Sequence, residues 1–248
     1  YANEFELVSM SDGLKLLQQG KGFTKRYLVI SFDDGLASAK EVLPDINAFG
    51  VKPTFFVNSD PLINSKPLHN HQELICVHYG DSYKFQNIQT LRDKYHYMLQ
   101  NDYMNLSSND TTTNQDEFKN YVRNAYLNKY AIQQMLHENR IEIGTHSSCH
   151  SVLSGLDHET QYEIICESHE KIEALLSTSI PYFSFPFGKL HHRDYCSEYI
   201  AARTAKYVFS CNGGINQTPG INGAILRIGI HNETVPALRS LLARQRIR

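Results

Sequence analysis

The chain has 248 residues, of which 41% are hydrophobic and 20% charged, and its formal net charge at pH 7 is −2. This composition is that of an ordinary globular protein, long enough for one large domain or two small ones. The near-neutral charge gives no reason to expect nucleic acid or an anionic membrane as a partner. No apolar run approaches the ~20 residues that a membrane-spanning helix needs, so we expect no membrane span.

The cysteines point away from a disulfide or metal framework. They are five in number, which is odd, and no two of them have CxxC spacing. They are Cys76, Cys149, Cys166, Cys196 and Cys211.

The N-terminal residues include neither a basic region nor an apolar segment, so no signal peptide is visible. Unpaired thiols and the lack of a visible export signal favour a location in the cytoplasm. An extracytoplasmic location is expected if such a signal has been removed.

Short apolar runs rich in β-branched and aromatic residues recur along the chain and predict strands. They lie at residues 27–32, 54–57, 141–144, 182–185, 207–210 and 225–230. Continuous apolar character is typical of strands buried on both faces of a parallel sheet. Helical patterns lie between several of these runs, at Leu14, after Ser38, after a capping Asp157, and at residues 131–139 and 198–206. The alternation predicts an α/β fold, open or barrel-like.

Residues from about 61 to 130 break this rhythm. They are polar and rich in Asn and Tyr, with a loop-like stretch at 105–114 between helical patterns at 88–103 and 116–130. We expect a single domain over residues 1–248, with this segment inserted between the second strand and the strand at Ile141. Long insertions on such scaffolds are often lids or specificity elements. The histidines in it, His69, His71 and His78, are interpreted as surface or lid residues and not as ligands.

The segment Ser31-Phe-Asp-Asp-Gly35 follows the first strand directly and is the most informative stretch of the chain. Its adjacent carboxylates, Asp33 and Asp34, would repel each other unless a cation, a shared proton or solvent compensated their charge. α/β enzymes place their chemistry at the carboxyl ends of strands. The pair is therefore a candidate catalytic or metal-binding site.

A second signal is His146-Ser-Ser-Cys-His150, which follows the strand that ends at Gly144. HxxxH places both imidazoles on one face if the segment turns helically. Alone this is weak evidence in a chain with 12 histidines. Together with a carboxylate from the earlier strand, the histidines could form a two-His, one-carboxylate site with open positions. Cys149 lies between them, but the spacing favours the histidines as ligands.

Two looser signals follow. Phe183-Ser-Phe-Pro-Phe-Gly188 is, in its simplest interpretation, a strand that ends in a turn. His231 comes just after the last apolar run, where a lone histidine is more often structural than catalytic. The basic cluster at residues 189–193 could face a substrate, although a solvated loop is the favoured interpretation.

In order and spacing, these four segments resemble the polysaccharide deacetylases with a NodB homology domain, carbohydrate esterase family 4. Ser31-Phe-Asp-Asp-Gly35 is similar to that family's T/S-F-D-D-G, and His146-Ser-Ser-Cys-His150 to its H-S/T-x-x-H. The segment ending in Pro186-Phe-Gly188 and the histidine at 231 resemble its two later motifs. The match covers about residues 27–57 and 141–231 and excludes the insertion. The resemblance implies a distorted (β/α)7 barrel, similar to a TIM barrel, with all four motifs on one rim.

The resemblance also implies an activity: metal-dependent removal of an N-acetyl group from an N-acetylated sugar of a polysaccharide, an oligosaccharide or a glycan precursor, such as one used in bacterial surface-polysaccharide assembly. The implied cofactor is one divalent metal. Zinc is the default for such ligands, and iron, cobalt, nickel or manganese also fit. Deformylation, O-acetyl ester hydrolysis and a catalytically impaired carbohydrate-binding relative remain alternatives. The implied roles are Asp33 as general base, Asp34, His146 and His150 as metal ligands, the Phe187 backbone amide as oxyanion donor, His231 as general acid, and Pro186, Phe187 and Gly188 as substrate contacts.

The sequence departs from the family at one position. Many members have an arginine two residues before the proline of the third motif, where it orients the base through a charge-assisted pair. Here that residue is Ser184. We hypothesise that Arg227, at the start of the last strand segment, supplies the missing guanidinium to Asp33. A surface or structural arginine is the alternative interpretation.

Overall fold

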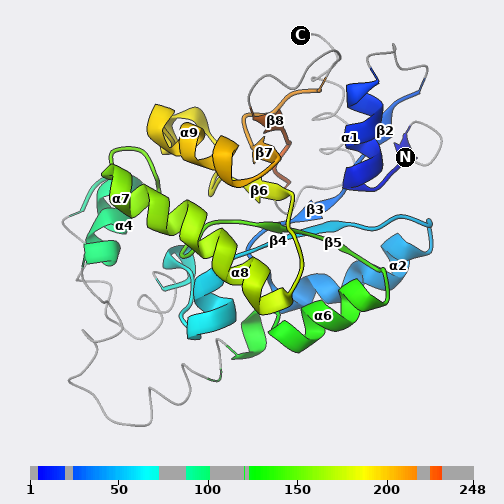
Figure 1. Cartoon of the computed structure of the whole chain (residues 1–248), viewed down its shortest axis with the longest axis horizontal. Helices are drawn as coiled ribbons and strands as arrows, with labels where there is room; N and C mark the ends of the chain where they lie inside the picture. The colour runs from blue at the N-terminus through cyan, green and yellow to red at the C-terminus, as the bar shows by residue number, and fades with distance from the viewer. Residues whose placement is uncertain are drawn as a thin grey trace.

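The computed structural model describes residues 5–19, 25–72, 88–100, 120, 123–216 and 224–230. Its centre is a parallel sheet whose six strands follow one another in chain order (Figure 1). These strands are β3 (Ser31–Phe32), β4 (Thr54–Val57), β5 (Glu142–Thr145), β6 (Tyr182–Ser184), β7 (Tyr207–Ser210) and β8 (Ile225–Leu226). Sequential parallel order is that of a barrel wall. The expected α/β, TIM-barrel-like fold is confirmed, with six strands in this sheet among the described residues.

The first predicted strand, at 27–32, is split in the structure. β2 (Tyr27–Leu28) pairs with β1 (Glu6–Leu7) in a separate two-stranded parallel sheet, and only Ser31 and Phe32 of β3 join the large sheet. The other predicted strands appear close to their expected bounds, except that β8 ends at Leu226 and not at residue 230 as predicted. β4 and β6 are buried along their whole length, as the unbroken apolar runs predicted for strands covered on both faces.

The helices lie on both faces of the curled sheet. They are α1 (Met10–Gln18), α2 (Leu43–Asn47), α4 (Leu91–Gln100), α6 (Lys129–His137), α7 (His158–Tyr162), α8 (Ser168–Leu176) and α9 (Tyr195–Thr204). Figure 1 shows α2, α6 and α8 along one face, with α1 on the other. Asp157 caps α7 as predicted, since its side chain accepts a hydrogen bond from the Thr160 N–H at 2.8 Å. Among the described residues, no helix has the length and apolar character to cross a membrane.

The core follows from the alternation of side chains along the strands. Phe55 and Val57 of β4 belong to a cluster with residues of α6 and α8, whereas Phe56 between them packs with Met10 of α1. α1 also contacts the start of β5, because one of its backbone N–H groups donates to the Glu142 carboxylate at 3.1 Å, so it lies at the end of the strands opposite the motifs. This packing leaves the carboxyl ends of the strands for polar side chains.

The described parts of the expected insertion pack against the body. α4 matches the helix predicted at 88–103, and α6 begins two residues before the helix predicted at 131–139, after an Asn128 cap. The predicted loop at 105–114 lies outside the described residues, as do Cys76, His78 and residues 116–119, 121 and 122 of the helix predicted at 116–130, which is interrupted at 126–128. The four described cysteines are free thiols, as expected.

Candidate active site

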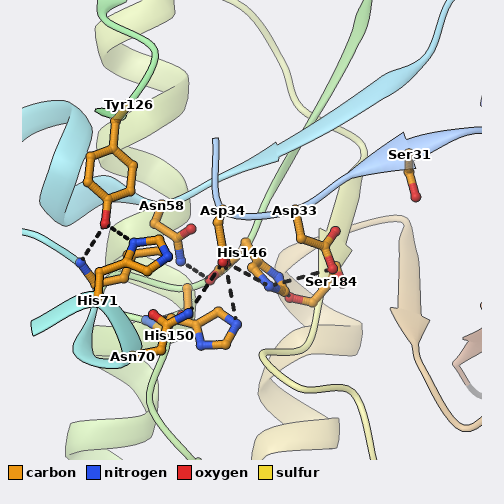
Figure 2. A network of polar contacts seen from close by, with 12 residues as sticks. Ser31, Asp33, Asp34, Asn58, Asn70, His71, Tyr126, His146, His150 and Ser184 are labelled. Atoms are coloured by element: carbon orange, nitrogen blue, oxygen red, sulfur yellow. Dashed lines mark hydrogen bonds and ion pairs between the residues drawn. The ribbon is translucent and has the colours of Figure 1, made fainter. Parts of the chain in front are cut away.

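The two carboxylates after β3 are separated by a backbone reversal. Asp34 has φ 67° and Gly35 has φ 62°, both in the left-handed region, which Asp and Gly tolerate better than other residues. As a result, adjacent residues direct their carboxylates to different partners. Figure 2 shows the Asp34 carboxylate directed towards two imidazoles, with Asp33 beside it on the Ser184 side.

Asp34 lies in a cluster with His146 and His150. Its Oδ1 atom is 3.4 Å from Nε2 of His150 and 3.7 Å from Nε2 of His146. One ligand atom from each of the three residues lies within 4.8 Å of the others. The three residues predicted as metal ligands are thus brought together by the fold.

The surroundings of His146 fix the tautomer of its ring. Nδ1 is 2.7 Å from the carbonyl oxygen of Ser184, and a carbonyl can only accept, so Nδ1 carries the proton. The Nε2 lone pair is then directed towards Asp34. The Asn58 side-chain amide donates to the His146 carbonyl and holds the backbone of the loop. Such partners behind a ligand histidine are typical of metal sites.

The cluster also has the unsatisfied atoms that a cation would satisfy. Asp34 Oδ1 and His146 Nε2 are buried and have no hydrogen-bond partner among the described residues. Burial lowers the pKa of His150 to about 4, although the Asp34 carboxylate opposes that shift, so the imidazole is neutral at pH 7. A carboxylate and two neutral imidazoles are a ligand set for a divalent transition metal, and these residues fit one.

The HxxxH segment is not helical, which corrects one expectation. Ser147 and His150 have φ values of 69° and 59°, in the left-handed region, and the Ser147 hydroxyl accepts from the His150 N–H at 3.2 Å. A looped backbone, and not the helical repeat, brings the two rings to a centroid distance of 5.0 Å. Cys149 is buried in the core, and burial raises the pKa of its thiol to about 12, so it stays protonated.

Asp33 is paired with Arg227. Nη1 of the guanidinium donates to Oδ1 at 2.7 Å and Nη2 donates to Oδ2 at 2.9 Å, a two-pronged pair that fixes the plane of the carboxylate. Burial alone would raise the pKa of Asp33, but the charge of Arg227 and the hydrogen bonds it donates outweigh burial and hold that pKa well below its usual range. Asp33 is therefore an anion at neutral pH.

Ser184 is part of the support for Arg227. Its side chain is buried, and its hydroxyl accepts from Nη2 of Arg227. Nη1 also donates to the Ser31 hydroxyl at 3.2 Å, and the guanidinium carbon lies 4.8 Å from the centre of the Phe56 ring. The guanidinium follows β8, whereas Ser31 and Asp33 belong to β3 and the loop after it. This contact joins the first and last strands of the curled sheet. The arginine that the sequence lacks at 184 is thus replaced, in space, by one from another strand.

The turn after β6 lies against the metal-ligand cluster. The Gly188 N–H donates to the Pro186 carbonyl at 2.6 Å, and Phe187 between them has φ 58°. The Phe187 ring packs edge-on against His150, with centroids 4.4 Å apart. Only glycine fits at 188, since a Cβ there would lie 2.3 Å from the backbone nitrogen of Cys211. The predicted oxyanion donor therefore lies near the cluster.

The basic segment after this turn is not a solvated loop throughout. Arg193 is buried, with Nε 2.7 Å from Glu198 and Nη1 donating to the Gly188 carbonyl at 2.8 Å. The favoured interpretation of this segment was wrong for Arg193, because its guanidinium is needed to satisfy a buried carbonyl. His192 is half-buried, and the centroid of its ring lies 4.9 Å from that of the Phe187 ring. His231, predicted as the acid, lies outside the described residues.

The insertion contributes polar residues beside Asp34 that the sequence patterns did not reveal (Figure 2). The Asn70 amide is 3.5 Å from Asp34 Oδ2. The Tyr126 hydroxyl accepts from the Leu68 N–H at 3.1 Å and also bonds Nδ1 of His71. No local spacing marks these residues, and only the high Asn and Tyr content hinted at them.

His69 corrects the interpretation of the insertion histidines as surface residues. It is only 5% exposed, and its ring lies 5.7 Å from that of Tyr95. Burial lowers the pKa of His69 to about 3, and the nearby His150 and Lys66 add to that shift. The insertion is anchored next to the site as well, since the Leu127 N–H donates to the Gly35 carbonyl at 2.8 Å.

Comparisons with known proteins agree with this geometry. A family model described as polysaccharide deacetylase matches residues 20–203. No curated protein matches the chain. Among solved structures, the deacetylase PplD of Streptococcus pyogenes, in complex with acetate, has a TM-score of 0.62 at 14% identity, over 98% of this chain and 80% of that one. IcaB of Ammonifex degensii has a TM-score of 0.63 at 12% identity, over 96% and 82%. The BpsB deacetylase domain of Bordetella bronchiseptica has 0.59 at 14%, over 92% and 80%.

Proposed function

The chain belongs to the polysaccharide deacetylase family, and from this premise we propose that it removes the N-acetyl group from an N-acetylated sugar of a polysaccharide, an oligosaccharide or a glycan precursor. One observation carries the proposal. Asp33 accepts two hydrogen bonds from Arg227, whereas Asp34 Oδ1 and His146 Nε2 are buried beside His150 without a hydrogen-bond partner among the described residues. That division gives one site both a base and a cation site.

In the proposed reaction, water adds to the acyl carbon, the C–N bond breaks, and acetate and a free amine are formed. Asp33 accepts a proton from the attacking water, and its carboxylate is held in one plane by Arg227. A carboxylate with a low pKa is a weak base. A divalent cation bound by Asp34, His146 and His150 would supply what Asp33 lacks, because a Lewis acid acidifies water and polarises an acyl oxygen.

The remaining roles fall to the turn after β6 and to the last motif. We assign the Phe187 backbone amide to the oxyanion that develops on the acyl oxygen, where a fixed donor is worth most. Pro186 and Gly188 shape the surface beside it. The leaving amine must gain a proton, and we assign its delivery to His231.

The test is acid release from defined acylated sugars. The protein is stripped with a chelator, reloaded with Zn²⁺, Fe²⁺, Co²⁺, Ni²⁺ or Mn²⁺ in turn, and incubated with N-acetylglucosamine oligomers. We expect equal amounts of acetate and new amine, and neither from the stripped protein. Release of formate from N-formyl sugars would assign a different acyl group to the site, and release of acetate from O-acetyl sugars alone would assign it an ester bond in place of an amide. Sugar binding without hydrolysis under every metal would instead indicate an impaired carbohydrate-binding relative.

A further inference from the structure

The turn at Phe187 has a backbone conformation that a bulky residue rarely adopts. Phe187 has φ 58°, and the hydrogen bond from Gly188 N–H to Pro186 O closes a three-residue turn around it. Such turns with positive φ at the centre are rare and strained. They persist where the surroundings over-determine them, and they cluster at functional sites.

Three rings surround the Phe187 side chain, and we call them the aromatic clamp. Tyr95 stacks on it with centroids 5.7 Å apart and ring planes 18° apart. His150 and His192 meet it edge-on, at 4.4 Å and 4.9 Å. Stacked and edge-to-face pairs at these distances are attractive and fix ring orientation. The side chain of Phe187 is thus fixed from several directions while its backbone stays strained.

Tyr95 comes from the insertion, far in sequence from the motifs. It lies on α4, is 2% exposed, and shares an apolar cluster with Met98 and Val152 against which Phe187 packs. α4 is also anchored by polar contact, because Nε2 of His96 lies 3.1 Å from the carbonyl of Val152, just after His150. The helix is therefore fastened to the segment that carries a predicted ligand and to the predicted oxyanion donor.

We propose that Tyr95 is a positioning residue, and that α4 uses it to hold the Phe187 turn so that the backbone amide stays beside the His146 and His150 cluster. This inference rests on the proposed function, because the amide matters to rate only if an acyl group is transferred. The proposal assigns a role to the insertion, in which the inserted helix is a fixed support for the oxyanion donor. Loss of that support should lower turnover more than it weakens substrate binding.

The activity test compares Tyr95→Ala with Tyr95→Phe, which keeps the stacked ring. Removing an oxyanion donor outright costs about 10²–10³ in kcat, so loss of its support should cost about tenfold to a hundredfold. We expect that fall in kcat for Tyr95→Ala, with KM within about threefold, metal content unchanged and near-normal turnover in Tyr95→Phe. Leu99→Ala is the matched control, since Leu99 lies on the same helix but packs against a different cluster. A rise in KM alone, or an equal loss in Tyr95→Phe, would overturn the proposal.

Hydrogen exchange tests the clamp without reference to catalysis. In Tyr95→Ala the Gly188 amide should exchange at least about tenfold faster than in the parent protein, because local opening no longer breaks the stack. The amides of residues 146–150 should change less, and Leu99→Ala should leave Gly188 protected. Unchanged exchange at Gly188 in Tyr95→Ala would refute the clamp. If the parent protein released no acyl group from any substrate, the proposed function would fail while the exchange result still decided this inference.

Discussion

The Asp33 side and the Asp34 side of the site differ in how the protein compensates a buried carboxylate. Asp33 is matched within the chain by two hydrogen bonds from Arg227. Asp34 faces two imidazoles, and its Oδ1 atom is buried without a hydrogen-bond partner among the described residues. The first side is complete as folded, whereas the second has the unsatisfied atoms that the proposed cation would bind. The difference shows how two identical neighbours acquire different chemistry from their surroundings alone.

The largest effect should come from the Asp34 side. We expect Asp34→Asn to lose bound metal and at least about 10³-fold in acetate release, because a neutral amide cannot balance a divalent charge. Metal per chain and acetate release are measured together on the same preparation. Asp45→Asn, at an exposed aspartate on α2, is the control and should change neither. Retained metal in Asp34→Asn would mean that the cluster is not the metal site.

A smaller loss should follow from breaking the Asp33 side. Arg227→Met removes the guanidinium that lowers the pKa of Asp33, while the burial that raises it remains. The base must be ionised to act, so a higher pKa shifts the acidic limb of the kcat/KM profile to higher pH. We expect a loss of about 10²–10⁴ in kcat at neutral pH, the range that a positioned base contributes. The pH profile and the metal content are both measured, and we expect the metal content to be unchanged.

The double variant Ser184→Arg with Arg227→Ser sharpens this comparison. It moves the guanidinium to the position that many family members use. Recovery of activity relative to Arg227→Met would show that Asp33 needs the charge and not a particular strand. Lower metal content in Arg227→Met would contradict the separation of the two sides.

The smallest effect is expected at the edge of the Asp34 side. Tyr126→Phe removes the hydroxyl that accepts from the Leu68 N–H and bonds His71. A buried donor left unsatisfied costs about 1–3 kcal/mol, so the free energy of unfolding should fall by about that amount. Turnover should change only a few-fold, as the metal ligands keep their own partners. Denaturant unfolding measures the first quantity and acetate release the second. Tyr130→Phe, at an exposed tyrosine, is the control.

Local sequence patterns predicted the strands and helices around the parallel sheet well, but they predicted poorly which residues of the insertion reach the site. The strands and the three ligand candidates could be predicted because apolar runs and motif spacing are short-range signals in the sequence. Asn70, Tyr95 and Tyr126 were missed because no motif marks them, and the helical patterns at 88–103 and 116–130 indicate helices without indicating what those helices contact. Burial of His69 and Arg193 was missed for a related reason, since a polar residue is buried only when folding brings it a compensating neighbour.

The sequence by itself determined the parallel α/β architecture and the residues available for chemistry, because the apolar runs of buried strands and the order of the motifs can be recognised in the sequence. Tertiary structure decided which partner each residue received. Arg227 reaches Asp33 across 194 positions because the first and last strands of a curled sheet approach each other. The left-handed turn at Asp34 then directs the second carboxylate to the histidines. The contact between Arg227 and Asp33 has no local signature, since it depends on the closure of the sheet.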